Sequence, residues 1–376
     1  MLKGFYLTLL IGPTVPVPAP QPVIDALTSV QITTSSGQRS GFQLSFALSK
    51  ASLLSRVLLP AGLFDPNMRV IIIMTINGMP NVLMDGIIMR QEVAPSNELG
   101  QSTLTITGED VSVLMDLIEI KGMAFPAMSA EIQVGLIIAK YAIYGMVPLI
   151  IPSLFPDIPI PIKEIRFEKG TDLAHITKMA EDFGYVFFIE PGPAPGMNLA
   201  YWGPEIRIGL PQPALNINMD AHTNVESLSF SYDGSSREQL AILIQEPLTK
   251  LPIPIPLPEI SLLSPPLALR QATALKFKFL EGSAKLNPLQ AMARGLGAVS
   301  KSADAITASG QLDVLRYGRV LKARQLVGVR GASTAYNGLY YVKSVTHDVQ
   351  VRNGAYKQSF TLARNGLISL TPRVVP

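Results

Sequence analysis

Two segments, one near each end of the chain, predict the same succession of strands. In the C-terminal segment, alternating apolar residues predict strands over 326–329, 339–351 and 357–363. Asn353-Gly354 separates the last two strands, and Asn-Gly is the dipeptide that favours a tight type I′ hairpin turn. Phe360 and Leu362 alternate with polar residues, which indicates one buried face and one solvated face.

The N-terminal segment follows the same order. It predicts strands over 68–76, 81–91 and 101–108, with a turn at Asn77-Gly78 and an interruption of the middle strand at Asp85-Gly86. Both closing strands begin with Gln-Ser, at Gln101-Ser102 and at Gln358-Ser359. The shared order of strand, turn, long strand, loop and strand indicates an internal repeat.

We therefore predict an α+β fold, mainly β, in which two related small β-barrels flank a middle α+β domain. The first barrel is expected over 1–110 and the middle domain over 111–224. The second barrel is expected over 225–250 and 311–376, interrupted by a Pro-rich and helical insertion over 251–310.

The remaining elements follow from local patterns. Further strands are expected at 5–11, 26–34, 41–49, 185–190, 197–202, 225–232 and 239–245, the last two returning to the second barrel, and the middle domain is expected to continue through 206–210. Helices are expected at 111–118, 129–144, 170–185 and 287–299, with 300–310 as the tail of the last one. Alternate prolines over 252–258 predict an extended path.

The composition favours an oligomer. Hydrophobic residues make up 48% of the chain and charged residues 16%, which leaves apolar surface for an interface. The most apolar stretch, 134–155, is broken by Lys140, Pro148 and Pro152, so no direct membrane span is expected. We expect 5–11 to be an edge strand rather than a signal peptide. The chain has no cysteine, which excludes disulfides and thiolate chemistry.

Positive charge is concentrated at the C-terminus. Residues 311–376 contain ten Lys and Arg but only Asp313 and Asp348 as acids. This asymmetry is consistent with an acidic partner or a charged channel wall. It is equally consistent with solvation of the outward faces of the barrel, and the sequence leaves both interpretations open.

No motif predicts a catalytic, cofactor or metal site. The three histidines, His175, His222 and His347, have no metal-ligand spacing, so we expect each to be structural. Ser333 lacks the strand-to-helix context of a nucleophile elbow. We therefore expect a protein that is not an enzyme and that holds no cofactor or metal.

The combined pattern resembles the phage tail hub, or late control D, family, which includes the hub portion of VgrG-type spikes. The resemblance covers nearly the whole chain in order, although each motif is short. The residues that carry it are 68–76, 82–88, 102–110, 170–173, 184–187, 338–342, 345–347 and 360–364. The N-terminal residues 4–19 resemble hubs of phage-tail-like contractile injection systems. The resemblance implies a baseplate location in a virion tail or a phage-tail-like particle assembled in the bacterial cytoplasm.

The resemblance also implies partners. Such hubs are homotrimers, and two barrels in each chain give a ring of six that joins a hexameric inner tube to a trimeric spike. The expected partners are the inner tube protein, a spike or tip protein and other baseplate components, with no specific nucleic acid. Thr103, Thr105 and Thr361 are the candidates for the tube interface. Because no needle-base domain follows the second barrel, the tip is expected to be another polypeptide.

Two other functions are kept as alternatives. A tail-associated peptidoglycan hydrolase would use carboxylates of the middle domain, with Glu181, Asp182, Glu190 and Glu205 as candidates. A carbohydrate-binding protein would need an aromatic platform, for which the chain offers a single tryptophan, Trp202. The sequence does not distinguish a phage from an extracellular or membrane-anchored injection system, and it does not identify the cargo, the target cell or the spike partner.

Overall fold

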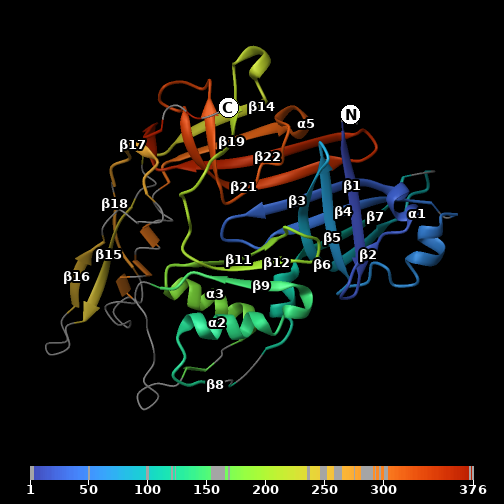
Figure 1. The fold of residues 1–376 in the computed structure, drawn as a ribbon, viewed down its shortest axis with the longest axis horizontal. Coiled ribbons are helices and arrows are strands. Elements are labelled where there is room, and N and C mark those ends of the chain that lie inside the picture. Colours follow the sequence, from blue (N-terminus) through green and yellow to red (C-terminus); the bar gives the residue numbers. More distant parts are fainter. Residues whose placement is uncertain are drawn as a thin grey trace.

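The computed structural model of the chain is built around one large β-sheet, with a smaller α+β domain below it and small sheets to one side (Figure 1). The structure describes residues 4–371 and 374, except 50, 99–100, 120–121, 123, 154–165, 168–169, 235–237, 246–251, 258–264, 275, 281–290, 293, 296–297, 300–303 and 372–373. The fold is α+β and mainly β, as predicted.

The large sheet contains strands from both ends of the chain. They are β1 (Phe5–Gly12), β2 (Val17–Pro18), β3 (Leu27–Ser35), β4 (Gly41–Leu48), β5 (Arg69–Ile76), β6 (Met79–Ala94), β7 (Ser102–Asp110), β13 (Gln212–Asn216), β14 (Val225–Tyr232), β19 (Ile306–Asp313), β20 (Leu326–Arg330), β21 (Gly338–Gln350) and β22 (Ala355–Arg364). Their hydrogen-bonded order is β14-β19-β22-β21-β3-β4-β7-β6-β5-β1-β2, with β20 joining β21 to β13.

One hydrophobic core is common to both halves of this sheet. Leu9, Ile72 and Leu104 come from the N-terminal strands, and Val342 and Leu362 come from the C-terminal strands. β7 and most of β22 alternate buried residues with more exposed polar ones, so burial of one face sets the register of these strands. Short helical segments flank the sheet: α1 (Gln21–Ala26), a π-helix (Leu54–Leu58) and α5 (Val314–Tyr317).

The middle domain packs two helices against a three-stranded sheet. It contains α2 (Ala130–Ala139), α3 (Asp172–Asp182), β9 (Met146–Ile150), β11 (Val186–Pro191) and β12 (Asn198–Gly203). Thr171 caps α3 by accepting a hydrogen bond from the backbone N–H of Ala174, as its sequence predicts. Trp202 is fully buried in this domain's core and therefore provides no surface for a sugar.

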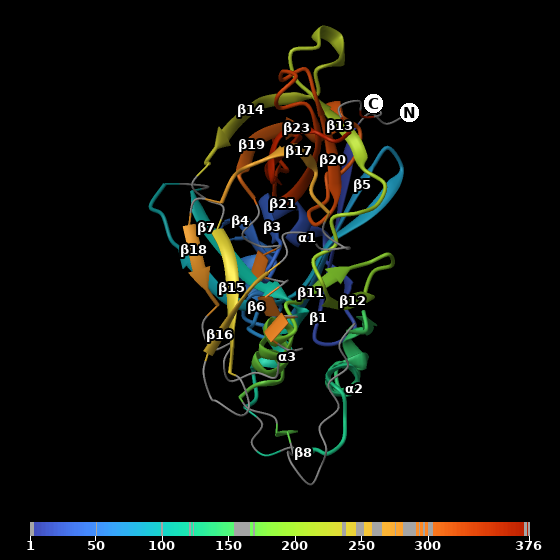
Figure 2. The ribbon, with the colours of Figure 1, turned by 90° about the vertical axis from the view of Figure 1, so that its left-hand side faces the viewer.

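Smaller elements complete the described structure. Three-residue to six-residue 3₁₀ helices lie at Val111–Asp116, Ala142–Tyr144 and Asp220–His222, and β8 (Ala124–Phe125) pairs with β10 (Arg166–Phe167). β16 (Pro252–Pro256), β15 (Glu238–Gln245) and β18 (Lys276–Phe279) form one side sheet, and β17 (Ala268–Gln271) pairs with β23 (Gly366–Ser369) (Figure 2). No helix in the described ranges is long and apolar enough to span a membrane.

Several sequence predictions are corrected by the structure. The strand expected at 239–245 exists, but it lies in the side sheet and does not return to the second barrel. The helix tail expected at 300–310 is wrong over 306–310, because these residues belong to β19, which pairs with both β14 and β22. The predicted start of the helix at 287 lies outside the described residues.

The two Asn-Gly hairpins are confirmed, but they differ in detail. Asn77 and Gly78 both have positive φ, 50° and 81°, as a type I′ turn requires. In the second hairpin only Gly354 has positive φ, and the turn extends over 351–354, so the type I′ prediction is wrong there. The expected interruption at Asp85-Gly86 is also wrong, because β6 runs through it without a break.

Candidate assembly surface

The two halves of the large sheet have the same strand order. The N-terminal half follows β3-β4-β7-β6-β5-β1, and the C-terminal half follows β14-β19-β22-β21-β20-β13. Each long strand, β6 or β21, lies between a short strand that precedes it and a closing strand that follows it. The final pairs differ, since β1 is antiparallel to β5 whereas β13 is parallel to β20. The predicted repeat is therefore present at the level of strand order.

The repeat also holds residue by residue. Asn67 and Arg324 each precede the short strand with positive φ, 73° and 62°. The N–H of Asn67 donates to the Ile88 carbonyl, and the N–H of Arg324 donates to the Val342 carbonyl, at 2.9 and 2.8 Å. Directly after these positions the long strand bulges in both halves, between Ile88 and Arg90 and between Val342 and Ser344.

A second pair of bulges extends this correspondence to the outer strands. β3 shifts register against β4 between Leu27 and Ser29, and β14 shifts against β19 between Val225 and Ser227. β-bulges re-aim a strand at a defined residue, so bulges at matching positions identify matching strands. β3 and β14 are thus the same element of the two units.

The structural correspondence does not follow the Gln-Ser pairs seen in the sequence. The matching bulges align Thr107, opposite Arg90, with Thr361, opposite Ser344. Gln358 is then equivalent to Leu104, and both are fully buried. Comparing the two segments by sequence identified the right strands, but aligning them on their Gln-Ser pairs was wrong. Burial of the core face sets the register of the strands, and a repeated polar pair does not.

The outward face of the large sheet is polar and continues across the junction of the two units. One row of neighbouring residues runs across the strands through Thr107, Gln43, Gln31, Asp348, Lys357 and Asp313. A second row runs through Thr33, Thr346, Ser359, Gln311 and Ser227. The hydroxyls of Thr33 and Thr346 lie 3.1 Å apart at the junction. We call this surface the polar face.

The three predicted interface threonines lie on this polar face. Thr103 is exposed and Thr105 is half-buried on β7, and Thr361 is half-buried on β22. Thr105 lies opposite Ser45 on one side and Glu92 on the other, and Thr361 lies between Ser309 and Ser344. The structure thus places them on equivalent strands of the two units.

Four of the ten basic residues in 311–376 are used inside the described structure. Arg364 is buried, donates to the carbonyls of Gly366, Asn337 and Ala335, and lies 4.4 Å from the Tyr340 ring centroid. The Arg324 guanidinium lies 4.0 Å from the Phe188 ring centroid. Lys343 pairs with Asp304, and Lys357 pairs with Glu226. Four others are exposed, namely Arg316, Arg319, Lys322 and Arg352. Their exposure is compatible with binding to an acidic partner.

A buried ion pair fastens the N-terminal unit to the middle domain. Arg69 donates to both carboxylate oxygens of Asp85 at 2.7 and 2.6 Å, and both side chains are almost fully buried. Arg69 also donates to the carbonyls of Tyr144 and Gly196, and Asn198 donates to Asp85 at 2.8 Å. The contacts cross from β5 and β6 to residues around β9 and β12. Sequence reasoning did not identify this pair, because an acid and a base on adjacent strands are a common pattern.

A second buried cluster joins the middle region to the C-terminal unit. Arg207 pairs with Asp304 and lies 3.5 Å from Glu205, and Lys343 reaches the other oxygen of Asp304. Burial opposes ionisation of Asp304, but the charges of Arg207 and Lys343 outweigh it and hold the pKa of that carboxyl below its usual value. Opposite charges satisfy one another here, so the cluster is structural.

The carboxylates proposed for a hydrolase do not form one site. Glu181 and Asp182 lie at the end of α3 and pair with Lys178, whereas Glu205 belongs to the cluster around Arg207 and accepts a hydrogen bond from Ser36. Glu190 lies on β11. Ser333 lies in an exposed turn between β20 and β21. Among the residues that the structure describes, no group of three His, Cys, Asp or Glu could hold a metal ion.

The histidines have different surroundings. His347 is buried on β21, and its Nδ1 lies 2.6 Å from the Tyr356 hydroxyl. Burial lowers the pKa of His347 to about 4, so the ring is neutral at pH 7. His175 stacks on Phe125 in the middle domain, and His222 is exposed in a short 3₁₀ helix.

The fold is similar to solved structures of phage tail proteins. A tail protein from Neisseria meningitidis MC58 has 14% identity and a TM-score of 0.62 over 97% of this chain and 98% of that one. The 43 kDa tail protein of prophage MuSo2 from Shewanella oneidensis has 13% identity and a TM-score of 0.60 over 96% and 99%. The chain thus has a phage tail protein fold over its whole length.

A secretion-system protein shares the same fold. An Escherichia coli component of the type VI secretion system, described as similar to T4 bacteriophage tail proteins gp27 and gp5, has 9% identity and a TM-score of 0.51 over 93% of this chain and 77% of that one. No family model and no curated protein sequence matches the chain. The predicted resemblance to tail hubs is confirmed at the level of the fold.

Proposed function

We propose that the chain is a structural hub at the centre of the baseplate of a contractile phage tail or a phage-tail-like injection system, and that it is not an enzyme. The observation that carries this proposal is the repeated unit: two copies of one six-strand arrangement, matched at the bulges and at Asn67 and Arg324, lie side by side in one sheet. A trimer would then present six near-equivalent units. Such a ring adapts a hexameric tube to a three-fold spike.

The proposed division of the chain follows this function. We propose that the chain contains two tube-facing units. The first is 1–110, and the second consists of the C-terminal strands within 212–232 and 304–371. The second unit thus has other boundaries than the 225–250 and 311–376 expected from the sequence. The middle domain, expected over 111–224, would support them, with the 251–310 insertion at the side. The two units would be the small β-barrels expected from the sequence. The inner tube protein, a spike protein and other baseplate components would be the partners, and assembly would take place in the bacterial cytoplasm.

We propose that the polar face docks the inner tube and that Thr103, Thr105 and Thr361 belong to the contact. The face suits this role because it carries hydroxyl and amide groups at equivalent places in both units, so each tube subunit would meet a similar surface. The test is tube nucleation by the purified chain in the presence of its tube protein. Thr105→Glu with Thr361→Glu places a charge at the same face of each unit and is expected to abolish nucleation.

A matched variant makes this test specific. Thr177 is an exposed threonine on α3, away from the polar face, and Thr177→Glu is expected to nucleate tubes normally. Circular dichroism of all variants shows whether they fold. Normal nucleation by the folded Thr105→Glu, Thr361→Glu variant would show that this face does not dock the tube.

A further inference from the structure

The junction of the two units inside one chain shows how one unit binds the next. β21 pairs with β22 along one edge, and its other edge pairs first with β20 and then with β3 of the N-terminal unit. The antiparallel register places Val345 opposite Thr34, His347 opposite Ile32, and Val349 opposite Val30. The N–H of Ser36 donates to the Lys343 carbonyl, and the N–H of Val351 donates to the Thr28 carbonyl.

The equivalent edge of the other long strand has no partner among the described residues. β6 pairs with β5 up to Ile87 and with β7 up to Ala94, so one edge of residues 89–94 continues beyond β5 unpaired. All six of these residues are exposed, including Met89 and Val93 at 43% and 48%. In the matching part of β21, Val345, His347 and Val349 are buried under β3.

The strand that would fill this edge is equivalent to β3 and lies at the far end of the sheet. β14 corresponds to β3, and in the described structure its strand partner is β19 alone, which leaves its outer edge open. Leu228 and Phe230 of β14 are half-buried, whereas the equivalent Val30 and Ile32 of β3 are fully buried beside β21. An open edge of this length is a template for another strand.

We propose that β14 of one copy of the chain adds to the outer edge of β6 in the next copy, in the register that β3 adopts on β21. This inference rests on the proposed trimeric hub and names the surface that holds it together. The occupant of each edge is a second copy of the chain, because the chain carries both halves of the same contact and already forms it once internally.

The internal junction fixes the register of the proposed contact. The matching bulges align β6 with β21 and β14 with β3, so the register of β3 on β21 gives the register of β14 on β6. Four cross-strand pairs follow: Gln91 with Tyr232, Glu92 with Ser231, Val93 with Phe230, and Ala94 with Ser229. Val93 and Phe230 would occupy the places of His347 and Ile32 and would become buried. The next positions bring Arg90 opposite Asp233, which places opposite charges together. Pro95 has no N–H, so the hydrogen-bonded ladder ends there.

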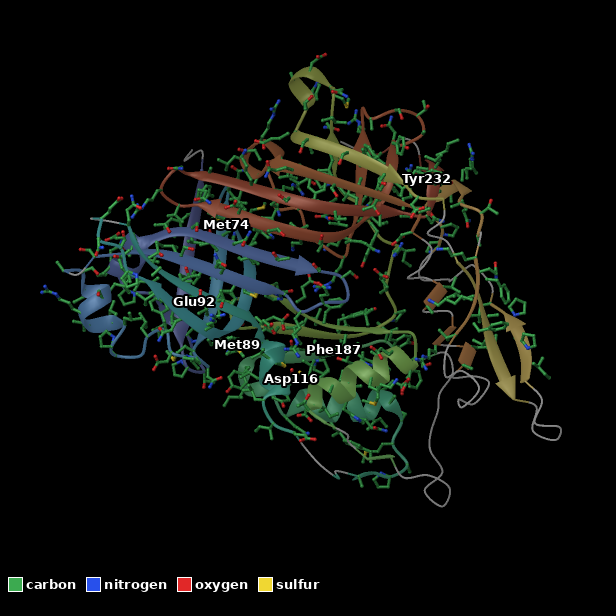
Figure 3. The ribbon with its side chains drawn as sticks, turned by 180° about the vertical axis from the view of Figure 1, so that it is seen from behind. Met74, Met89, Glu92, Asp116, Phe187 and Tyr232 are labelled. Carbon is green, nitrogen blue, oxygen red and sulfur yellow. The ribbon has the colours of Figure 1, made fainter. Side chains whose placement is uncertain are left out.

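The two edges cannot meet within one chain. Glu92 and Tyr232 lie far apart across the sheet (Figure 3), and the sheet order places six strands between β14 and β6. The contact is therefore head-to-tail between copies, and a head-to-tail contact gives a closed ring if the rotation closes. Closure at three copies would alternate the internal β21–β3 junction with the intermolecular β6–β14 junction.

A disulfide cross-link tests the register, since the chain has no cysteine of its own. Glu92 and Ser231 correspond to Thr346 and Thr33, whose hydroxyl oxygens are 3.1 Å apart. Both positions are exposed, so Glu92→Cys with Ser231→Cys places two thiols across the junction without disturbing a core. Under mild oxidation we expect a covalent trimer on a non-reducing gel. The matched control is Glu92→Cys with Ser229→Cys, which lies two residues out of register and is expected to cross-link at least about tenfold less.

A proline variant tests the same edge without oxidation. In the internal junction the backbone groups of every second residue of β21 face β3, as the bonds at Lys343 and Val351 show, and His347 belongs to this set. Val93 is the equivalent residue of β6, so its N–H and C=O face the open edge. Val93→Pro removes one of these donors and leaves the ladder with β7 intact. We expect the trimer to dissociate at a concentration at least about tenfold higher, whereas Val93→Thr keeps the donor and behaves as the parent.

Light scattering of the parent chain separates the possible failures. A parent trimer whose Glu92→Cys, Ser231→Cys variant cross-links no better than its control would overturn the proposed pairing and leave the trimeric hub standing. A trimer unaffected by Val93→Pro would also overturn it. A parent chain that stays monomeric at high concentration, with no cross-link, would contradict the proposed hub and the pairing together.

Discussion

Asn67 and Arg324 occupy the same position in the two units of the sheet. Both residues have a left-handed backbone, and both donate an N–H to the long strand one residue before its bulge. The two side chains share no chemistry, so it is the backbone geometry that is repeated. Asparagine tolerates this conformation through its short polar side chain. Arg324 is held there by its hydrogen bond to the Ser35 carbonyl and its contact with the Phe188 ring.

The left-handed position gives a first prediction. Asn67→Val introduces a β-branched residue at φ 73° and is expected to lower the free energy of unfolding by about 1–2 kcal/mol. Asn67→Gly removes the steric cost and is expected to be neutral within about 0.5 kcal/mol. Urea denaturation measures both. Equal stability of the Val and Gly variants would show that this conformation is not a constraint on the unit.

The buried pair between Arg69 and Asp85 gives a second prediction. Asp85→Asn keeps the shape of the side chain but leaves the Arg69 guanidinium buried without its counter-charge. Removing one partner of a buried pair costs about 3–5 kcal/mol, and urea denaturation is expected to show a loss of this size. Lys178→Ala breaks an exposed pair with Asp182 and is expected to cost less than about 1 kcal/mol. Similar losses in the two variants would contradict the anchoring role of Arg69.

His347 gives a third prediction, which concerns pH. Its pKa is lowered to about 4 in the folded state, against 6.5 unfolded, so below pH 6.5 the unfolded chain binds the additional proton. The contribution of His347 to stability is complete above pH 6.5 and is lost as the pH falls towards 4. The shift corresponds to about 3 kcal/mol. A protonated Nδ1 could no longer accept hydrogen bonds from Tyr356 and Gln358.

The comparison with His347→Gln isolates this effect from other titrating groups. Between pH 7 and pH 4.5 the parent chain is expected to lose more stability than the variant, as followed by thermal unfolding at each pH. The two chains should differ little in slope above pH 7. Parallel pH profiles throughout the acid range would show that burial of His347 does not contribute.

The exposed basic residues give a fourth prediction. If Arg316, Arg319 and Lys322 face an acidic partner, binding of tube or spike protein is expected to weaken by about tenfold or more as salt is raised from about 0.05 to 0.5 M, because exposed charges are screened. Arg316→Glu with Arg319→Glu is expected to reproduce this loss at low salt. Salt-insensitive binding would favour the simpler interpretation, in which these charges only solvate the surface.

The sequence predicted those features that local chemistry determines. Alternation of Leu104 and Ile106, the turn at Asn77-Gly78 and the cap at Thr171 each act within a few residues, and each appears as expected. The strand at 306–313 was missed because it is rich in small polar residues, and its place is fixed by β14 and β22 on either side. Long-range pairing of this kind leaves little trace in a short window of sequence.

The candidate surface was predicted in outline only. The sequence placed Thr103, Thr105 and Thr361 on outward faces because they alternate with apolar residues. It gave no indication that β21 pairs with β3, because that junction joins strands from opposite ends of the chain. The equivalence of β3 and β14 likewise depends on bulges, which are set by register between strands and not by residue type.

The mass of the purified chain in solution, measured by light scattering, tests whether the chain forms the proposed trimer. We expect a particle of three times the 40.6 kDa chain mass, because six equivalent units require three chains. The Val93→Pro variant is predicted to shift this particle towards the single-chain mass. A stable monomer of the parent chain over a wide concentration range, or a closed dimer, would show that the chain does not form this trimeric hub.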